Sequence, residues 1–493
     1  MRVAVLGLGV TGFAAADTLA ELGAEVLVLA DSAEDERRRL LEVIGARFAE
    51  TSEDALAAFD PELVIASPGY HPDHPLLLWA AGRGIAVWGD IELAWRLRDK
   101  VLRADGTAAD WILITGTNGK TTTTQLTATM LVAGGLRAAP CGNIGVPVLD
   151  AIRDPGGFDV LVVELSSYQL HWMHGLVSPL AATCLNLADD HFDWHGSAQA
   201  YRDAKARVYE NTRVACVYNL ADEATRTMVE EAEVLEGARA IGFGATIPGP
   251  SDVGIVEGIL VDRAFLDDRH HAALELATMD DLRESGLDAP HSIQNVLAAS
   301  ALARAADVPP TAIRDAIRAF RVDSHRTERV AESRGVIWVD DSKATNAHAA
   351  HAALSAFDSV VWIAGGQLKD VDPAPLIARH AARLRAAILI GSEREVLRAA
   401  FARHAPGVLL IEVEEPETGG VMPAVVRAAA SVAQPGDVVL LAPSAASFDQ
   451  FTGYADRGQR FADAVREHLE RGGAADDTDS PDLGPADPAA PAP

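Results

Sequence analysis

A glycine-rich segment with one lysine is the most chemically specific feature of the sequence. Gly116-Thr117-Asn118-Gly119-Lys120-Thr121-Thr122 follows the apolar run 111–115 and opens a helical pattern. The backbone N–H groups of such a loop can surround the β- and γ-phosphates of a nucleotide. Lys120 can neutralise these phosphates, and the Thr121 hydroxyl can ligate Mg²⁺. The segment predicts an ATP-type phosphate site, although Ile114 replaces the first glycine of a full GxxxxGK[ST] motif. A glycine-rich turn with a solvated lysine is the plain alternative.

Acidic and imidazole side chains at the ends of two other apolar runs could complete this site. The run 160–163 ends in Glu164, and the polar segment 186–193 contains His191. Mg²⁺ prefers oxygen ligands, so a carboxylate at a strand tip beside a phosphate loop predicts a metal ligand. An acidic helix cap and a solvated acidic turn are the respective alternatives. The local context of Lys205 suggests only an exposed helix lysine.

A second glycine-rich turn lies near the N-terminus. Gly7-Leu8-Gly9-Val10-Thr11-Gly12 follows a short apolar run, and Asp31 closes the next run. Glycines let the backbone approach a diphosphate at a helix N-terminus, and an acidic residue at this distance can hold a ribose. NAD(P), another diphosphate nucleotide and a close-packed turn without a ligand all fit this pattern.

Polar segments also follow apolar runs in the last third of the chain, at 340–346, 365–370 and 443–451. They could bind a nucleotide or an anionic substrate; helix capping by Asp341 or Ser342 and a solvated Lys369 are the alternatives. Six histidines have no partner at metal-ligand spacing and are expected to be ordinary helix or surface residues: His171, His174, His270, His271, His348 and His351.

The elements that position these residues follow from the alternation of short apolar runs with helical patterns, which is typical of βαβ units. We predict an α/β protein of three domains: a Rossmann-like domain at 1–97, a P-loop-type central domain at 108–322 and a Rossmann-like domain at 323–471. Residues 230–279 suggest short antiparallel strands. Residues 472–493 are Gly, Ala, Asp and Pro with little to bury, so a disordered tail is expected.

Composition excludes several function classes. The 493 residues include 42 Lys and Arg against 71 Asp and Glu, a net charge of −29, which argues against nucleic-acid or anionic-membrane partners. Three cysteines without CxxC spacing exclude a disulfide framework and a zinc ribbon and suit a reducing compartment. The glycine turn after Met1 favours a buried strand over a signal peptide, and no run reaches the ~18 apolar residues of a membrane span. We expect a cytoplasmic monomer that acts on small molecules.

Several motifs together resemble the Mur ligase family. GTNGKTT, ELSSYQL, a DDH segment, HR, DSKATN, GGQLK and SFDQF occur in the family's order and cover nearly all of residues 1–471. DSKATN and SFDQF are most similar to the D-glutamate-adding members, whereas GTxGKT is shared with folylpolyglutamate synthases. The resemblance implies an ATP- and Mg²⁺-dependent ligase of cytoplasmic peptidoglycan precursor synthesis. It would phosphorylate the carboxylate of UDP-N-acetylmuramoyl-L-alanine and join D-glutamate to the acyl phosphate.

The resemblance also implies roles for individual residues. The ATP-binding residues would be Gly116, Thr117, Asn118, Gly119, Lys120, Thr121, Thr122, Asn295, Arg326 and Asp341. The UDP-substrate, rather than NAD, would be held by Val10, Thr11, Asp31, Ser67, Asn143 and His191. Magnesium would be associated with Thr121, Glu164, His191 and Lys205, the last as an N-carboxylated lysine. The catalytic residues would be Lys120, Glu164, His191 and Lys205. D-Glutamate would contact Lys343, Thr345, Lys369, Ser447 and Tyr454.

The chain departs from the family pattern at Ser292 beside Asn295, at Ala33 close after Asp31, and at Tyr454, which is often Phe in the family. Four other activities stay open on sequence: addition of L-glutamate or another amino acid, a folate substrate, an NAD(P) oxidoreductase, and a nucleotide-binding scaffold without catalysis.

Overall fold

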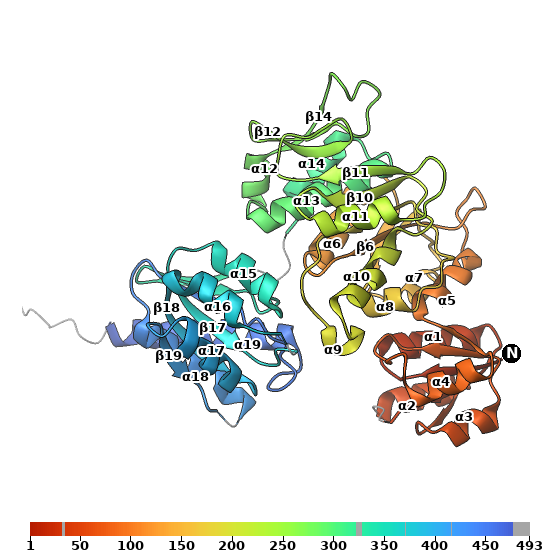
Figure 1. Cartoon of the computed structure of the whole chain (residues 1–493), viewed down its shortest axis with the longest axis horizontal. Helices are drawn as coiled ribbons and strands as arrows, with labels where there is room; N and C mark the ends of the chain where they lie inside the picture. Colours follow the sequence, from red (N-terminus) through yellow and green to blue (C-terminus); the bar gives the residue numbers. More distant parts are fainter. Residues whose placement is uncertain (32–34, 322–327, 370, 416, 477–493) are drawn as a thin grey trace, which may run out of the picture. The chain divides into compact units, whose positions relative to one another are not determined.

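The structure is a computed structural model that describes residues 1–31, 35–321, 328–369, 371–415 and 417–476. Its helices alternate with the strands of three largely parallel sheets, which confirms the predicted α/β fold (Figure 1). The chain divides into two compact units between residues 322 and 323. The first unit contains two of the sheets and the second unit contains the third.

The first sheet has five parallel strands in the order β3-β2-β1-β4-β5. Its elements are β1 (Arg2–Leu6), α1 (Val10–Glu21), β2 (Glu25–Leu29), α2 (Asp35–Val43), β3 (Arg47–Ala49), α3 (Glu53–Phe59), β4 (Leu63–Ala66), α4 (Pro75–Gly82), β5 (Ala86–Trp88) and α5 (Asp90–Arg96). The strand order reverses between β1 and β4, where open α/β sheets place a ligand crevice. The glycine turn after β1 and Ser67 after β4 therefore meet at this crevice. A Cβ on Gly12 would lie 2.1 Å from the carbonyl oxygen of Gly7, so only glycine permits this close turn.

The second sheet has nine strands in the order β14-β13-β12-β11-β10-β9-β6-β8-β7. Its strands are β6 (Asp110–Thr115), β7 (Ala138–Gly142), β8 (Val160–Glu164), β9 (Ala181–Cys184), β10 (Ala215–Asn219), β11 (Arg239–Phe243), β12 (Asp252–Val256), β13 (Ile259–Asp262) and β14 (Leu274–Thr278). The pairs β12–β13 and β13–β14 are antiparallel, as expected within residues 230–279, whereas β11 is parallel to both of its neighbours. Because β6 lies between β8 and β9, the polar segments after these three strands meet at one edge of the sheet.

The helices of this second sheet are α6 (Lys120–Ala133), α7 (Val148–Ala151), α8 (Ser167–His171), α9 (Phe192–His195), α10 (Ala198–Ala206), α11 (Glu223–Glu231), α12 (Met279–Glu284), α13 (Pro290–Ala305) and α14 (Pro310–Ala319). Short 3₁₀ turns occur in the chain at η1 (Arg98–Lys100), η2 (Arg207–Tyr209) and η3 (Ala381–Arg383).

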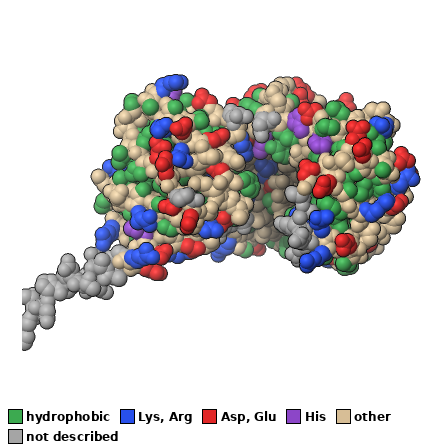
Figure 2. All heavy atoms as spheres, turned by 90° about the horizontal axis from the view of Figure 1, so that it is seen from below, with side chains coloured by type: hydrophobic (Ala, Val, Ile, Leu, Met, Phe, Trp, Pro, Cys, Tyr) green, Lys and Arg blue, Asp and Glu red, His purple; other side chains and the backbone are tan. Residues whose placement is uncertain are grey.

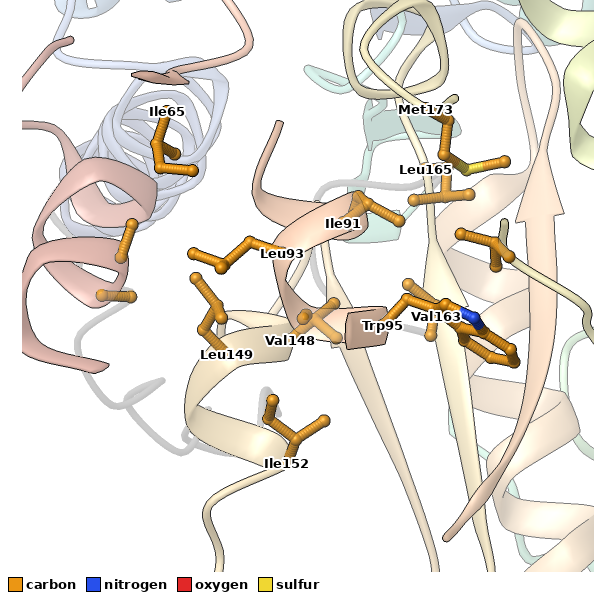
Figure 3. Close-up of a cluster of buried hydrophobic side chains, with 14 of the residues drawn as sticks. Ile65, Ile91, Leu93, Trp95, Val148, Leu149, Ile152, Val163, Leu165 and Met173 are labelled. Carbon is orange, nitrogen blue, oxygen red and sulfur yellow. The ribbon is translucent and has the colours of Figure 1, made fainter. Parts of the chain in front are cut away.

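A shared hydrophobic core joins the first two sheets. The side chains of Ile91, Leu93 and Trp95 on α5 lie beside Val148 and Leu149 of α7 (Figure 3), within one buried cluster that draws residues from both sheets. Helix α5 therefore buries apolar surface against the N-terminal sheet and the nine-stranded sheet together, which is why they form one compact unit. The sequence predicts separate domains at 1–97 and 108–322 and gives no sign of this shared core.

The third sheet has six strands in the order β15-β16-β20-β17-β18-β19, with only β15 antiparallel to its neighbour. Its elements are β15 (Glu328–Ser333), β16 (Val336–Asp340), α15 (Ala347–Ser355), β17 (Val360–Gly365), α16 (Ala374–His380), β18 (Leu384–Ile390), α17 (Arg394–His404), β19 (Leu409–Glu412), α18 (Thr418–Val432), β20 (Val438–Leu441) and α19 (Tyr454–Asp476). Since β16, β20 and β17 are adjacent, the three polar segments that follow them lie side by side. Helix α19 extends past residue 472, where the tail was expected to begin, and residues 477–493 lie outside the described residues.

Acidic and basic side chains are interspersed on the face of the molecule shown in Figure 2. Cys141, Cys184 and Cys216 are buried free thiols, as the absence of a disulfide framework predicts. Among the helices that the structure describes, none combines the length and the apolar character needed to cross a membrane.

Candidate active site

The glycine-rich loop at 116–122 joins β6 to α6 and adopts a conformation that requires glycine. Gly119 precedes the first turn of α6 with φ +82°, and Gly116 has φ +148°. A Cβ on Gly119 would lie 2.3 Å from Oδ1 of Asn295, a buried side chain of α13. Asn295 therefore packs directly on the phosphate loop, at the position where the sequence analysis places an ATP contact.

Lys120 and the start of α6 make this loop electropositive. The Lys120 ammonium donates to the carbonyl oxygens of Gly116 and Thr117 at 2.9 and 3.0 Å. The N-terminus of α6 adds the positive end of the helix dipole. The lysine is thus held against the loop and is not the solvated side chain of the plain alternative.

The segment after β9 fixes the other side of the loop. The N–H of Thr117 donates to the carbonyl oxygen of Asn186 at 3.0 Å, and the N–H of Asn118 donates to the side-chain Oδ1 of Asn186 at 2.9 Å. Nδ2 of Asn186 donates back to the carbonyl oxygen of Asn118 at 3.1 Å. These three hydrogen bonds fix the loop against the segment that carries His191.

Lys205 of α10 lies under the phosphate loop and is only 2% exposed. Its ammonium donates to the carbonyl oxygen of Gly116 at 2.9 Å and to Oγ1 of Thr115 at 3.3 Å, and it lies 4.9 Å from the ring centre of Tyr201. Within the described part of the chain, no carboxylate forms an ion pair with it. Burial, reinforced by the positive charge of Lys120, lowers the pKa of Lys205 to about 7. The prediction from the local sequence that Lys205 is an exposed helix lysine is therefore wrong.

Glu164, at the end of β8, presents a buried carboxylate oxygen to the same site. Oε1 accepts a hydrogen bond from Nδ2 of Asn143 at 2.9 Å, whereas Oε2 is buried and has no hydrogen-bond partner among the residues that the structure describes. Helix α8 is capped by Ser166, so Glu164 is not the acidic cap of the alternative interpretation. A buried oxygen without a donor is costly, and a hard cation would satisfy it. Glu164 therefore fits a magnesium ligand.

Within the described residues, no three His, Cys, Asp or Glu side chains are grouped to hold a metal on their own. Mg²⁺ usually takes one or two carboxylates and completes its shell with water and phosphate oxygens, so Glu164 with the Thr121 hydroxyl fits this cation.

Among the histidines expected to be ordinary, Nδ1 of His351 contacts Nε2 of His380 at 2.7 Å. The side chain of His348 lies outside the described residues.

His191 is fixed by its neighbours rather than solvated. Its φ of +57° places it in the left-handed region just before α9. Nδ1 lies 2.6 Å from the hydroxyl of Tyr168, and Nε2 lies 3.6 Å from Oδ2 of Asp190. The imidazole therefore has a defined orientation, suited to binding an anionic group or accepting a proton.

Four of the residues predicted for the UDP-substrate lie around the N-terminal crevice, whereas Asn143 and His191 contact Glu164 and Tyr168 in the central domain. Val10 and Thr11 form the N-terminus of α1, where Val10 is 59% exposed. Ser67 Oγ is buried, has no hydrogen-bond partner within the described part of the chain, and lies 2.8 Å from a Cβ built on Gly7. Free helix N–H groups and an unpartnered hydroxyl suit a diphosphate. Asp31 is exposed beyond the end of β2.

Arg37 is a basic residue of this crevice that the sequence analysis missed. Its guanidinium, on α2, donates to the carbonyl oxygen of Leu8 in the glycine turn at 3.1 Å. The run Arg37-Arg38-Arg39 shortly after Asp31 was the available signal. Ala33, the departure from the family pattern, lies outside the described residues.

In the second unit, Lys343 and Tyr454 lie together. The Lys343 ammonium donates to the Tyr454 hydroxyl at 3.0 Å and lies 4.6 Å from its ring centre. Helix α15 is capped by Asn346, so the capping alternative for Asp341 and Ser342 is wrong. The Ser342 hydroxyl instead donates to the carbonyl oxygen of Tyr454 at 2.7 Å.

Arg457 is a fully buried arginine that the sequence analysis also missed. It donates to Oγ and the carbonyl oxygen of Ser342 at 2.9 and 2.8 Å, and to the carbonyl oxygen of Ala445 at 3.2 Å. Burial lowers its pKa to about 10. Arg457 thus ties the loop of Lys343 to the loop of Ser447, and an arginine within a helical pattern gave no sign of this.

The remaining predicted residues of this unit lie on the same adjacent loops. The N–H of Thr345 donates to the carbonyl oxygen of Lys343 at 2.8 Å, Lys369 has φ +56°, and Ser447 is 2% exposed. A Cβ on Gly366 would lie 2.1 Å from the carbonyl oxygen of Ala446, so the loops after β17 and β20 are in direct contact. Arg326 lies outside the described residues.

The geometry defines a multidomain α/β nucleotide-binding protein with a P-loop-type site. Three family models match successive parts of the chain: the Mur ligase MurD-like N-terminal domain at residues 1–89, the Mur ligase middle domain at 114–303 and the Mur ligase glutamate ligase domain at 325–445. The chain belongs to the Mur ligase family. Its first glycine turn is thus part of a Mur ligase N-terminal domain and not of an NAD(P) oxidoreductase.

Curated relatives carry the name of one Mur ligase along almost the whole chain, and solved structures share the fold. The chain is 64% identical over 491 residues to the UDP-N-acetylmuramoylalanine--D-glutamate ligase of Leifsonia xyli, covering 97% of this chain and 95% of that protein. It is 52% identical to the enzyme of the same name from Streptomyces avermitilis, covering 94% and 98%. A pseudomurein peptide ligase from Methanothermus fervidus shares the fold with TM-score 0.56 at 15% identity, over 95% and 99% of the chains. MurF from Thermotoga maritima, solved in complex with ADP, has TM-score 0.54 at 15% identity, over 91% and 95%.

Proposed function

We propose that the chain is an ATP-dependent ligase that joins the amine of D-glutamate to the carboxylate of UDP-N-acetylmuramoyl-L-alanine. Relatives that carry this activity in their names match along almost the whole chain. The structural observation that carries the proposal is the phosphate loop with Lys120 above the buried Lys205 and beside the unpartnered oxygen of Glu164.

The reaction needs ATP because a carboxylate is a poor electrophile. A carboxylate oxygen attacks the γ-phosphorus, the bond to ADP breaks, and an acyl phosphate forms. The neutral amine of D-glutamate then attacks the acyl carbon, the C–O bond to phosphate breaks, and the nitrogen loses a proton. Most of the catalysis is positioning and stabilisation of negative charge.

Residues of the first unit hold ATP and the activated carboxylate. The loop 116–122 and Lys120 bind the phosphates, and Asn295 contacts the nucleotide beside Gly119. Thr121, Glu164 and His191 would hold Mg²⁺, which would neutralise charge on the phosphates. A phosphate oxygen accepts the proton from the amine when Nε2 of His191 holds Mg²⁺; otherwise His191, whose Nδ1 contacts the Tyr168 hydroxyl, accepts it.

As a carbamate, Lys205 would be a further residue able to hold Mg²⁺. Its nitrogen attacks the carbon of CO₂, a new N–C bond forms, and a proton is released to water. The product is an anion, which suits a buried position beside Lys120, whereas an ammonium cannot ligate a cation. The support for this step is that the lysine is buried with no acidic partner in the described part of the chain.

The two substrates bind at the remaining candidate residues. Those for the UDP-substrate are Val10, Thr11, Asp31, Ser67, Asn143 and His191. Those for D-glutamate are Lys343, Thr345, Lys369, Ser447 and Tyr454. Arg326 and Asp341 contribute to ATP binding.

The partners of the chain are these small molecules, and it acts as a monomer in the cytoplasm. The three free buried thiols suit a reducing compartment, and ATP is available there.

The test is phosphate release from ATP with Mg²⁺, UDP-N-acetylmuramoyl-L-alanine and D-glutamate, followed by the mass of the product. We expect phosphate release only when all components are present, and a product larger by one glutamate residue. L-Glutamate in place of D-glutamate should give no product. Release only with a different amino acid, or none with the complete mixture, overturns the proposal.

A further inference from the structure

Two hydrogen bonds join the loop after β4 to the short helix α9. Nε1 of Trp194 donates to the carbonyl oxygen of Gly69 at 3.3 Å, and Nε2 of His71 donates to the carbonyl oxygen of Trp194 at 2.8 Å. The rings of His71 and Trp194 meet edge to face, with their centres 5.4 Å apart. Nδ1 of His71 contacts the carboxylate of Asp73, which fixes the ring. We call this arrangement the Trp194–His71 contact.

The two sides of the Trp194–His71 contact belong to different ends of the proposed substrate path. On one side, Gly69 follows Ser67, whose unpartnered hydroxyl lies in the N-terminal crevice. On the other side, Trp194 packs on Tyr168 with ring centres 4.8 Å apart, and the Tyr168 hydroxyl holds Nδ1 of His191 at 2.6 Å. Direct contacts therefore run from the diphosphate side of the crevice to the imidazole at the reaction site.

We infer that Trp194 and His71 are positioning residues that set the span between the loop holding the UDP-sugar and His191. The inference rests on the proposed function. A substrate gripped at its diphosphate reacts efficiently only if its carboxylate arrives in the reacting geometry, and a small misplacement costs much of the rate. The contact thus selects nucleotide-sugar substrates with a single residue between the muramoyl group and the reacting carboxylate.

The fold does not depend on this contact. The first two sheets share the buried core formed by α5 and α7, with side chains such as Leu93 and Val148. The His71 side chain, in comparison, is 44% exposed. Hydrogen bonds of this kind stabilise a structure only modestly. Removing them should change where the substrate is held and leave the folded chain intact.

A second histidine offers a matched control. Nε2 of His174 bonds to the carbonyl oxygen of Val87 at 3.1 Å. This bond also joins the N-terminal sheet to the central sheet through an imidazole and a backbone oxygen. It involves neither the loop after β4 nor any residue proposed for the substrates.

The experiment compares Trp194→Phe, His71→Ala and His174→Ala by steady-state kinetics of the full chain. Trp194→Phe keeps the ring on Tyr168 and removes the N–H donor. We expect the KM for UDP-N-acetylmuramoyl-L-alanine to rise about 2- to 10-fold in the first two variants, the effect of one lost hydrogen bond. The KM values for ATP and D-glutamate should stay within twofold, and His174→Ala should match the wild type.

A second substrate tests the selection of length. With UDP-N-acetylmuramoyl-L-alanyl-L-alanine, the preference of Trp194→Phe for the shorter substrate should fall at least about 2-fold relative to wild type. The double variant should lose less than the product of the single losses, because both residues serve one contact.

Each outcome is decisive. Unchanged KM and unchanged preference in an active enzyme overturn the inference and leave the proposed function standing. An equal rise of all three KM values indicates a general structural role and also overturns it. If thermal melting shows that Trp194→Phe is unfolded, His71→Ala on the exposed loop decides by the same criteria. A wild-type chain that forms no product overturns the proposed function and the inference together.

Discussion

Replacing Lys205 by methionine should abolish ligation and yet stabilise the first unit. The pKa of Lys205 is lowered from an ordinary 10.5 to about 7, by burial first and by Lys120 second. The folded state therefore binds this proton less tightly than the unfolded state, and keeping the lysine costs stability. At about 1.4 kcal/mol for each tenfold change in proton affinity, the cost is roughly 4 kcal/mol at pH 7.

The stability cost of the buried Lys205 should depend on pH. The cost is full below pH 7 and disappears as the pH rises toward 10.5, so roughly 2 kcal/mol should remain at pH 9. Methionine fills a similar volume without the charge. The carbonyl oxygen of Gly116 keeps the donor of Lys120 at 2.9 Å, so the change leaves that buried oxygen satisfied.

The measurement is thermal and urea unfolding of wild type and Lys205→Met at pH 7 and pH 9, in buffers free of bicarbonate. We expect the variant to be more stable at both values, with the larger gain at pH 7. Lys100→Met is the matched control, because Lys100 pairs with Glu21 at 2.6 Å and its loss should not stabilise the chain. A destabilised Lys205→Met, or an equal gain at both pH values, refutes the reasoning.

Three further predictions concern single residues. Gly119 has φ +82°, and a Cβ there would lie 2.3 Å from Oδ1 of Asn295. Gly119→Ala should therefore lower kcat/KM for ATP at least about 10-fold and the free energy of unfolding by about 1–2 kcal/mol. Normal ATP kinetics would contradict the loop geometry. Glu164→Gln keeps the hydrogen bond to Asn143 but loses the charge, so the Mg²⁺ concentration for half-maximal activity should rise at least about 10-fold. An unchanged magnesium titration would remove Glu164 from the metal site. Arg457→Lys cannot make all three bonds of the guanidinium, so the KM for D-glutamate should rise about 10-fold while the KM for ATP holds; a parallel rise in both would mean general damage.

The strands and the loops that follow them could be predicted from the sequence because parallel strands are buried on both faces. The runs ending at Thr115 and Glu164 are continuous apolar segments of this kind, and their carboxyl ends meet at one edge. The placement of the phosphate loop and of the Glu164 carboxylate follows from that rule. The residue roles came from the resemblance and stay predictions.

Other features depend on tertiary packing and cannot be recognised from the local sequence. Lys205 lies on the short helix α10, and its contacts with Thr115, Gly116 and Tyr201 form only in the folded chain. Arg457 is buried because two loops place three acceptors around it. The core shared through α5 has the same origin: its apolar residues predict burial, but not that two sheets share them.

The central claim is that ATP transfers its γ-phosphate to the carboxylate of the UDP-substrate. The most direct test supplies UDP-N-acetylmuramoyl-L-alanine with ¹⁸O in both carboxylate oxygens, together with ATP, Mg²⁺ and D-glutamate, and measures the isotope in the released phosphate. An acyl phosphate requires one ¹⁸O atom in each phosphate, because the oxygen that attacks phosphorus leaves with it. Phosphate without ¹⁸O, formed together with the ligated product, would contradict the account.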